Sequence, residues 1–369
     1  MRAARLTAAI CAALVVCSVT GLGASARADA ANPKLGVISV KSPTDAQLAR
    51  MGRAGLDVYR LNLYWPAIQP FGADSFHWNE AWLQPFDDQV CKAAKNGIRI
   101  LPTVFGSPRW ANGNKSPETP PLPAYLDEFS AFMAAAAARY GNGGTIWSDA
   151  NGPCAGVTPM PITVWQIWNE PNLNYFWSPG PNAAAYAKLL AAANDGLASS
   201  GAQVMMAGLS PRPRPAFGTR PIPYLSALYA NGVKPHFDVM AVHPYDLNPS
   251  NAFDQIDDLR AKMKTSGDGD KPLWITEIGW ASAGPKTGLT VKPAVQARYL
   301  ETMWKTARNS PGRRIKGMIW FSFRDVPYFE VTPPAPADGW TYHSGLFTSS
   351  GAPKPAWFTL ARLAGGNPY

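Results

Sequence analysis

The sequence predicts an α/β protein, a single (β/α)8 TIM barrel. Eight short apolar runs rich in β-branched and aromatic residues end at Pro, Gly or polar clusters, which is typical of buried strands. Stretches of helical length separate them, and this alternation favours a parallel sheet with right-handed crossovers. A Gly-rich dinucleotide-binding turn is absent after the first run, so closure into a barrel is favoured over an open sheet.

The expected strands and helices follow one another along residues 31–369, which we predict to form one domain. Barrels of this kind commonly have this length. Gly97 supports the expected end of one helix, because glycine is favoured just past helix C-termini. The expected strands are Leu35–Val40, Val58–Trp65, Ile98–Phe105, Ile162–Trp168, Gln203–Leu209, Phe237–His243, Leu273–Ile278 and Ile315–Phe323. The expected helices are Asp45–Gly55, Ala81–Asn96, Ala124–Tyr140, Ala183–Ser199, Pro221–Ala230, Phe253–Lys264, Pro293–Asn309 and Trp357–Ala364.

Residues 1–30 have the pattern of a cleaved signal peptide. Arg2 and Arg5 provide a basic start, residues 8–19 an apolar segment too short to span a bilayer, and residues 24–28 a small-residue cleavage site. No later stretch of the sequence is long and apolar enough to anchor the chain in a membrane. We therefore expect a secreted, extracellular protein without a membrane span.

The cysteines suggest one disulfide. Cys11 and Cys17 belong to the expected signal peptide, so Cys91 and Cys154 remain as an even pair in an exported chain. Cys91 lies near the end of an expected helix and Cys154 in the loop before an expected strand, and these positions share one face of a barrel. A structural disulfide is expected, with two separate free thiols as the alternative.

Composition excludes several classes of function. The formal net charge is +9 without any run of Lys or Arg, which favours a mildly basic soluble protein over a nucleic-acid or acidic-glycan binder. Phosphate-binding glycine loops and a GxSxG turn are absent from the sequence. None of the four histidines forms a pair with metal-ligand spacing, so neither a metal nor another cofactor is expected.

Two glutamates at the ends of apolar runs carry the chemistry that we expect. Glu170 lies in the run WNEPN and Glu277 in the run TEIGW, three βα units later. Active sites of (β/α)8 enzymes lie at the C-terminal ends of the strands. Two carboxylates there suggest glycoside hydrolysis, in which one protonates the leaving oxygen and the other attacks.

The two motifs closely resemble those of clan A glycoside hydrolases, with families 39 and 5 nearest in appearance. The resemblance covers the whole chain after the signal peptide and implies that Glu170 is the general acid/base and Glu277 the nucleophile. Burial and the charge of Glu277 should raise the pKa of Glu170, whereas Glu277 needs a cation and hydrogen-bond donors to stay ionised. For each glutamate considered by itself a structural role is the alternative: Glu170 could belong to a helix cap, and Glu277 could form a structural ion pair.

Further residues are expected around the pair. Arg60 is a charge within an apolar strand and needs a buried carboxylate. The resemblance implies that this carboxylate belongs to Glu277, and an aspartate of the barrel is the alternative partner. It also implies that Asn169 donates a hydrogen bond to the sugar 2-hydroxyl, with a plain turn role as the alternative. Tyr245 is implied to bond the nucleophile and His243 to orient the site, where a purely structural His243 is the alternative.

Tryptophans are expected in the sugar-binding cleft. Trp320 resembles the tryptophan that forms the floor of the subsite nearest the cleavage point, and in that clan the peptide bond after it is often cis. Indole faces stack on the apolar faces of pyranose rings. Packing is nearly as good an explanation for the other candidates, which are Trp65, Trp110, Trp177, Trp280 and Trp340.

We therefore expect a retaining O-glycosidase that cleaves a poly- or oligosaccharide by double displacement, without a cofactor and as a monomer. Two alternatives remain. A catalytically silent barrel bound to glycans or to a cell wall would have lost a site residue, yet Arg60, Glu170 and Glu277 are all present. A transglycosylase would use the same residues with a sugar as the acceptor. The sugar, its linkage and endo or exo cleavage depend on loops, which the sequence does not determine.

Overall fold

The structure, a computed structural model, describes residues 33–78, 85–211, 215–327 and 339–369. The expected signal peptide at residues 1–30 and the start of the expected helix 81–96 lie outside these ranges. The chain divides into residues 1–32 and a compact unit, Pro33–Tyr369, to which the fold described below belongs. Among the described residues, none of the helices is apolar over a length that would cross a bilayer.

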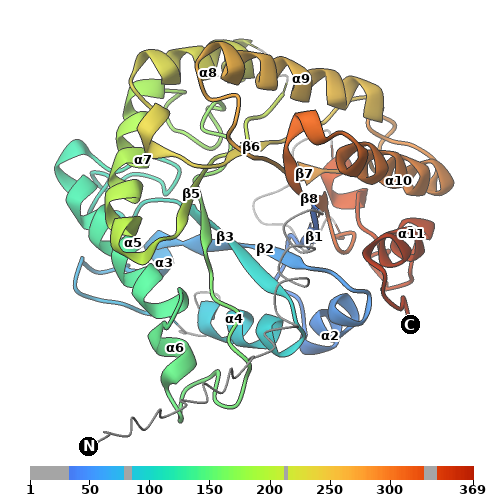
Figure 1. The fold of residues 1–369 in the computed structure, drawn as a ribbon, viewed down its shortest axis with the longest axis horizontal. Coiled ribbons are helices and arrows are strands. Elements are labelled where there is room, and N and C mark those ends of the chain that lie inside the picture. The colour runs from blue at the N-terminus through green and yellow to red at the C-terminus, as the bar shows by residue number, and fades with distance from the viewer. Residues whose placement is uncertain (1–32, 79–84, 212–214, 328–338) are drawn as a thin grey trace, which may run out of the picture. The chain divides into compact units, whose positions relative to one another are not determined.

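Eight parallel strands form one sheet that is nearly closed into a barrel (Figure 1). Their order is β5-β4-β3-β2-β1-β8-β7-β6, and β5 and β6 meet at the seam. Two isolated bridges, Met205–Val239 and Leu209–Val242, join them there. The predicted barrel is therefore confirmed. The strands are β1 (Lys34–Ile38), β2 (Val58–Tyr64), β3 (Arg99–Phe105), β4 (Val164–Ile167), β5 (Gln203–Met206), β6 (Met240–Val242), β7 (Leu273–Ile278) and β8 (Ile315–Phe321).

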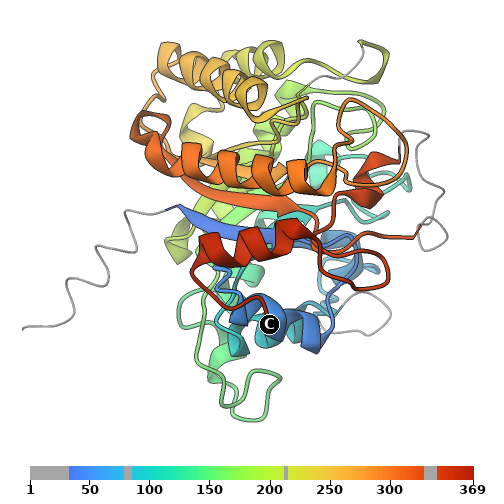
Figure 2. The same cartoon turned by 90° about the vertical axis from the view of Figure 1, so that its right-hand side faces the viewer.

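Helices enclose the strands, as the side view shows (Figure 2). Helix α9 begins at Pro249, four residues before the expected start, because Asn248 accepts a hydrogen bond from the Asn251 N–H and proline fits a first helical turn. The α-helices among the described residues are α2 (Asp45–Arg53), α3 (Trp65–Ile68), α4 (Phe86–Lys95), α5 (Leu126–Tyr140), α6 (Thr145–Ser148), α7 (Ala183–Leu197), α8 (Pro221–Ala230), α9 (Pro249–Thr265), α10 (Pro293–Asn309) and α11 (Pro355–Ala364).

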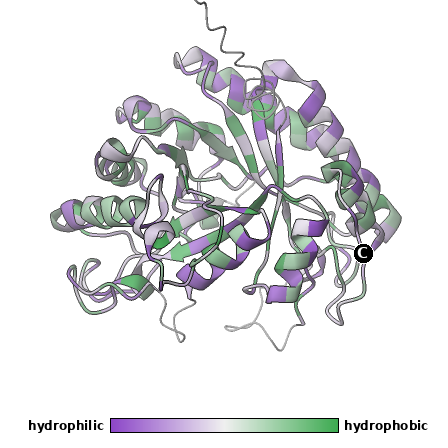
Figure 3. Cartoon of the chain, turned by 60° about the horizontal axis from the view of Figure 1, so that its bottom comes forward, coloured by the Kyte–Doolittle hydropathy of each residue, from purple (hydrophilic) through white to green (hydrophobic). Residues whose placement is uncertain are grey.

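The barrel interior is filled with side chains, so it is a packed core and not a pore. The partly buried Trp274 packs against this core, and a Cβ on Gly317 would lie 2.2 Å from its ring, which explains the glycine. The outer faces of the strands pack against the helices, whose ribbons carry both apolar and polar residues (Figure 3). The interior cluster consists of Val58, Leu101, Met205, Val239, Ala241 and Ile319.

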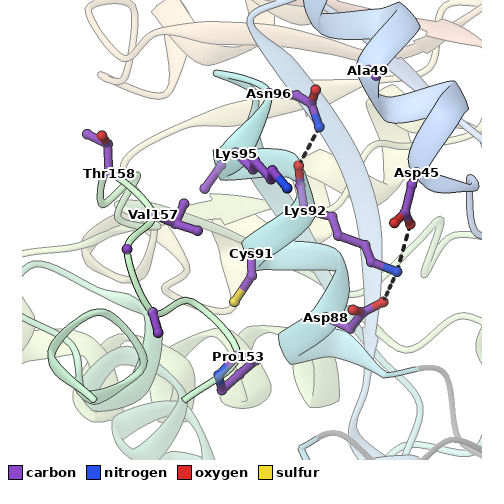
Figure 4. A pocket seen from close by; sticks show the side chains of 13 residues that line it. Asp45, Ala49, Asp88, Cys91, Lys92, Lys95, Asn96, Pro153, Val157 and Thr158 are labelled. Carbon is purple, nitrogen blue, oxygen red and sulfur yellow. Dashed lines mark hydrogen bonds and ion pairs between the residues drawn. The ribbon is translucent and has the colours of Figure 1, made fainter. Parts of the chain in front are cut away.

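A disulfide joins α4 to the segment that leads into β4. It links Cys91 and Cys154, whose Cα atoms lie 5.0 Å apart. Beside it, a cavity of about 750 Å³ lies between α2, α4 and the segment around Cys154 (Figure 4). On its wall Lys92 forms ion pairs of 2.7 and 2.8 Å with Asp45 and Asp88. None of the expected catalytic or sugar-binding residues lines this cavity, so it is separate from the candidate site.

Removal of the disulfide should destabilise the barrel. The Cys91→Ser/Cys154→Ser variant should lose about 2–4 kcal/mol of unfolding free energy, because the cross-link spans 63 residues and restricts the unfolded chain. Urea denaturation with and without reductant measures the loss. Reductant should lower the wild-type midpoint and leave that of the variant unchanged, whereas a wild-type midpoint insensitive to reductant would contradict the pairing.

Candidate active site

The structure gathers the expected catalytic residues at the C-terminal end of the barrel. Arg60 lies in β2 and Glu277 in β7, while Glu170 follows β4, and His243 and Tyr245 follow β6. The strands are parallel, so the residues at the carboxyl ends of β4, β6 and β7 meet at one end of the barrel, and the Arg60 side chain reaches them from within β2. Hydrogen bonds connect these residues directly, and Arg60 and His243 are almost completely buried.

Glu277 is held by two donors from other strands. One carboxylate oxygen lies 2.5 Å from Arg60 Nη1, and the other accepts a hydrogen bond of 2.9 Å from the Tyr245 hydroxyl. Burial opposes ionisation of Glu277, but the charge of Arg60 and the hydrogen bonds from Arg60 and Tyr245 lower its pKa. Glu277 is therefore an ionised carboxylate with both oxygens oriented.

Glu170 has the opposite electrostatic environment. Burial raises its pKa, and the charge of Glu277 raises it further, although a hydrogen bond of 2.8 Å with His243 Nδ1 opposes the shift. Two carboxyl groups whose pKa values move apart suit the roles of one proton donor and one permanent anion.

The backbone after β4 adopts the left-handed conformation at two non-glycine residues. Trp168 has a φ of 71° and Glu170 a φ of 39°. Such conformations cost about 1–3 kcal/mol each and concentrate at functional sites. Hydrogen bonds offset the cost: the Trp168 N–H donates to the Val104 carbonyl at 2.7 Å, and the Glu170 N–H donates to the Gly208 carbonyl at 3.2 Å. The turn that carries Glu170 is thereby fixed to both neighbouring strands.

Asn169 is oriented by the same arginine that holds Glu277. Its side-chain oxygen accepts a hydrogen bond of 3.0 Å from Arg60 Nη2. Because the oxygen faces Arg60, the amide nitrogen faces the other way and can donate to a sugar hydroxyl. Asn169 is therefore part of the carboxylate network and is partly exposed beside it.

Trp320 does not lie in the site, which corrects the expectation from sequence. It is fully buried, and its indole N–H donates to a backbone carbonyl. Neighbouring residues in a strand point to opposite faces, and Ile319 lies in the interior cluster, so Phe321 faces the barrel interior and Trp320 faces the helices. The half-buried Phe321 ring lies 6.4 Å from the Tyr245 ring. The cis peptide bond is also one residue later than expected, between Phe321 and Ser322.

Most of the other candidate tryptophans pack within the protein. Trp110 is partly exposed, but its indole N–H donates to a backbone carbonyl. Trp340 packs edge-on against Tyr245, with ring centroids 5.1 Å apart, so it supports the site. Three others are at most 1% exposed and too buried to contact a sugar, namely Trp65, Trp177 and Trp280.

Two buried polar residues below the carboxylates were missed by the sequence analysis. Gln166 accepts a hydrogen bond of 2.8 Å from Arg60 Nε, and its amide nitrogen donates to the Thr276 hydroxyl at 3.3 Å. That hydroxyl lies 3.0 Å from His243 Nε2. Both residues interrupt apolar strands, which is the signal that identified Arg60 and could have identified them.

One group of ligand atoms has the spacing of a metal site. An oxygen of Glu170, an oxygen of Glu277 and a ring nitrogen of His243 all lie within 4.8 Å of one another. Arg60 already neutralises Glu277, however, and both His243 nitrogens have hydrogen-bond partners. This donor set therefore suits proton transfer better than binding of a divalent cation.

Sequence comparison assigns the chain to a family. A family model described as the glycosyl hydrolase catalytic core matches residues 127–334, which is more than half of the chain. The chain belongs to this family. The match contains Glu170, His243 and Glu277, and it confirms the resemblance to glycoside hydrolases stated from the motifs. A search of curated proteins found no match to this chain.

Solved structures of glycoside hydrolases share the fold. A family 39 glycoside hydrolase from Bacteroides cellulosilyticus WH2 has a TM-score of 0.62 at 20% identity, over 91% of this chain and 64% of its own. A glucosidase from Croceicoccus marinus has a TM-score of 0.64 at 14% identity, over 91% and 68%. XacCel5A has a TM-score of 0.58 at 13% identity, over 90% and 98%. The chain thus spans about two thirds of the length of the first two, and identities this low support the fold alone.

Gly208 should be essential for the position of His243. A Cβ at Gly208 would lie 2.2 Å from His243 Nε2, so Gly208→Ala should displace the ring and lower kcat roughly tenfold or more. The rate of reducing-end release from a glycan that the wild type cleaves measures the effect. Gly312→Ala is the control, because nothing lies within 4 Å of its added Cβ. Equal rates for the two variants would contradict the close packing.

Proposed function

We propose that the protein is a secreted, retaining O-glycosidase that cleaves poly- or oligosaccharides by double displacement. The observation that carries the proposal is the short distance between two carboxyl groups whose pKa values are shifted in opposite directions. Retaining enzymes hold the two groups about 5–5.5 Å apart, whereas inverting enzymes need about 6.5–9.5 Å to admit a water. Oxygens of Glu170 and Glu277 within 4.8 Å of each other support direct attack.

In the first step, a Glu277 oxygen attacks the anomeric carbon as the glycosidic bond breaks. Glu170 gives its proton to the leaving oxygen, so the departing sugar leaves as a neutral alcohol. The product is a glycosyl ester on Glu277. The lowered pKa of Glu277 supports its role as the nucleophile, and the raised pKa of Glu170 supports its role as the acid.

In the second step, water attacks the anomeric carbon and releases Glu277. Glu170, now ionised, takes the proton from that water, and the cycle ends with both groups in their starting states. Asn169 can donate to a hydroxyl of the reacting sugar through the amide nitrogen that Arg60 leaves free. Two displacements at one carbon retain its configuration.

Secretion and the substrate class belong to the same proposal. The signal-peptide pattern of residues 1–30 supports export, and the Cys91–Cys154 disulfide fits an oxidising compartment. Membership of the glycosyl hydrolase family supports a carbohydrate substrate.

Substitution of either glutamate should abolish or severely reduce hydrolysis. Glu277→Ala should remove turnover, and Glu170→Ala should lower kcat by about 10²–10⁴, as expected for loss of a general acid. A panel of plant, fungal and bacterial wall glycans, read by reducing-end release, measures both. Glu301→Ala is the control, since Glu301 lies in α10 and pairs with surface cations.

Mass spectrometry with a panel of fluorosugars should find the covalent adduct on Glu277. Full activity of Glu277→Ala on a glycan that the wild type cleaves would overturn the assignment. Neither turnover nor adduct across the panels would instead favour a silent glycan-binding barrel.

The dependence of kcat/KM on pH should be bell-shaped, and one limb should move when Tyr245 is changed. Activity rises as Glu277 loses its proton at low pH and falls as Glu170 loses its proton at higher pH. Tyr245→Phe removes a hydrogen bond that lowers the pKa of Glu277, so the acid limb should shift to higher pH while the alkaline limb stays. Tyr229→Phe, which loses a hydroxyl contact with Asp268, is the control and should leave both limbs in place. An acid limb unaffected by Tyr245→Phe would contradict the assignment of that limb to Glu277.

A further inference from the structure

A chain of hydrogen bonds runs beneath both carboxyl groups and has a defined direction. It passes from Arg60 through Gln166, Thr276 and His243 to Glu170, with contacts of 2.8, 3.3, 3.0 and 2.8 Å. All members except Glu170 are at most 1% exposed, so water does not interrupt the chain. Which partner donates in each hydrogen bond follows from the hydrogen bond before it.

Arg60 fixes the orientation of the Gln166 amide. A guanidinium only donates, so the amide group that faces Arg60 Nε must be the oxygen. The Thr103 hydroxyl contacts the same oxygen at 3.2 Å. The amide nitrogen of Gln166 must therefore face Thr276 and donate to it.

The Thr276 hydroxyl in turn determines whether His243 Nε2 donates or accepts a hydrogen bond. Its hydroxyl oxygen accepts from Gln166 and has a single hydrogen of its own to donate. Within the described ranges, the other hydrogen-bond partner of this hydroxyl is His243 Nε2. If Nε2 carried a proton, the hydroxyl could accept from it as well, but the buried hydroxyl hydrogen would then have no acceptor among the described residues. The hydroxyl hydrogen therefore points at Nε2, which acts as the acceptor.

A neutral imidazole that accepts at Nε2 carries its proton at Nδ1. The Nδ1–H then donates to one oxygen of Glu170. When Glu170 is protonated, its proton must occupy the other oxygen, away from His243. The reverse tautomer would present an Nδ1 lone pair to Glu170, and that lone pair would bind the acid proton and withhold it from the leaving oxygen.

We propose that Gln166, acting through Thr276, is a positioning residue that fixes His243 in its Nδ1–H tautomer and so keeps the acid proton of Glu170 on the oxygen away from His243. The inference rests on the proposed role of Glu170 as the general acid. The other charged and titratable groups of the network are Arg60, Glu277 and Tyr245, and the substitutions below leave them in place.

Gln166→Glu tests the direction of the chain, because it replaces the amide nitrogen with an oxygen of the same shape. The new oxygen accepts from Thr276, the Thr276 oxygen then accepts from His243, and Nε2 becomes protonated. Long-range ¹H–¹⁵N NMR of the free protein distinguishes a protonated from an unprotonated ring nitrogen. The sequence has only four histidines, so single substitutions of the other three, His77, His236 and His343, assign the His243 signals.

The wild type should show Nδ1 protonated and Nε2 unprotonated at neutral pH, and Gln166→Glu should show Nε2 protonated. The matched control is Thr103→Val, since Thr103 is also a fully buried threonine bonded to Gln166 but lies outside the chain to His243. It should give the wild-type spectrum. A protonated Nε2 in the wild type, or an unprotonated Nε2 in Gln166→Glu, would overturn the proposal.

A second pair of variants changes no charge. Thr276→Val removes the hydrogen bond to Nε2 and should move the Nε2 signal, whereas Thr276→Ser keeps the hydroxyl and should restore it. If the two variants give the same Nε2 signal, the Thr276 hydroxyl does not fix the tautomer of His243, which would overturn the proposal. This pair keeps the proposal testable where Gln166→Glu does not fold.

Kinetics connect the tautomer to the reaction. Gln166→Glu and Thr276→Val should lower kcat about tenfold or more with little change in KM, since a general acid contributes roughly 10²–10⁴ in rate. The loss should be much smaller on 2,4-dinitrophenyl glycosides than on phenyl glycosides of the same sugar, because a good leaving group needs no proton. Equal losses on both would assign Gln166 a merely structural role and overturn the proposal. The NMR result does not depend on turnover, so failure of this proposal is distinguishable from failure of the glutamate assignments.

Discussion

A guanidinium buried beneath the two carboxylates is the constraint on which the site depends. A guanidinium has donors and no acceptor, so every polar group around Arg60 has to offer an acceptor. Glu277, Gln166 and Asn169 do so from β7, β4 and the turn after β4. Loss of one partner of such a buried pair typically costs about 3–5 kcal/mol. One side chain of β2 thereby fixes the positions of β4 and β7 relative to each other.

The two glutamates differ in chemistry only because their surroundings differ. Glu277 contacts a cation and a phenol, which stabilise its anion, whereas Glu170 contacts an imidazole and lies near another negative charge. Exchanging the roles would therefore require moving Arg60, since the glutamates themselves are identical. The difference between the two glutamates arises from Arg60 in β2 and from His243 and Tyr245 after β6, and not from β4 and β7, which carry the carboxylates.

Most of the fold and much of the site could be predicted from sequence, because apolar runs closed by Pro or Gly determine strands and a charge within such a run demands a partner. Arg60 was found this way. Trp320 was misplaced because both faces of a buried parallel strand are apolar, so the run around it has no alternation to tell the inward face from the outward one. Gln166 and Thr276 were visible as polar interruptions, but their partners depend on side-chain geometry that spacing does not encode.

The disulfide also determines how the protein responds to a protease. Cys91 and Cys154 enclose β3, α5 and the long loop between them, where Leu122 is 43% exposed. A single cut in that loop breaks the backbone but leaves the two fragments covalently joined across α4. The strands that carry Arg60 and Glu277 then remain parts of one molecule, and nicked protein separates into two chains only after reduction.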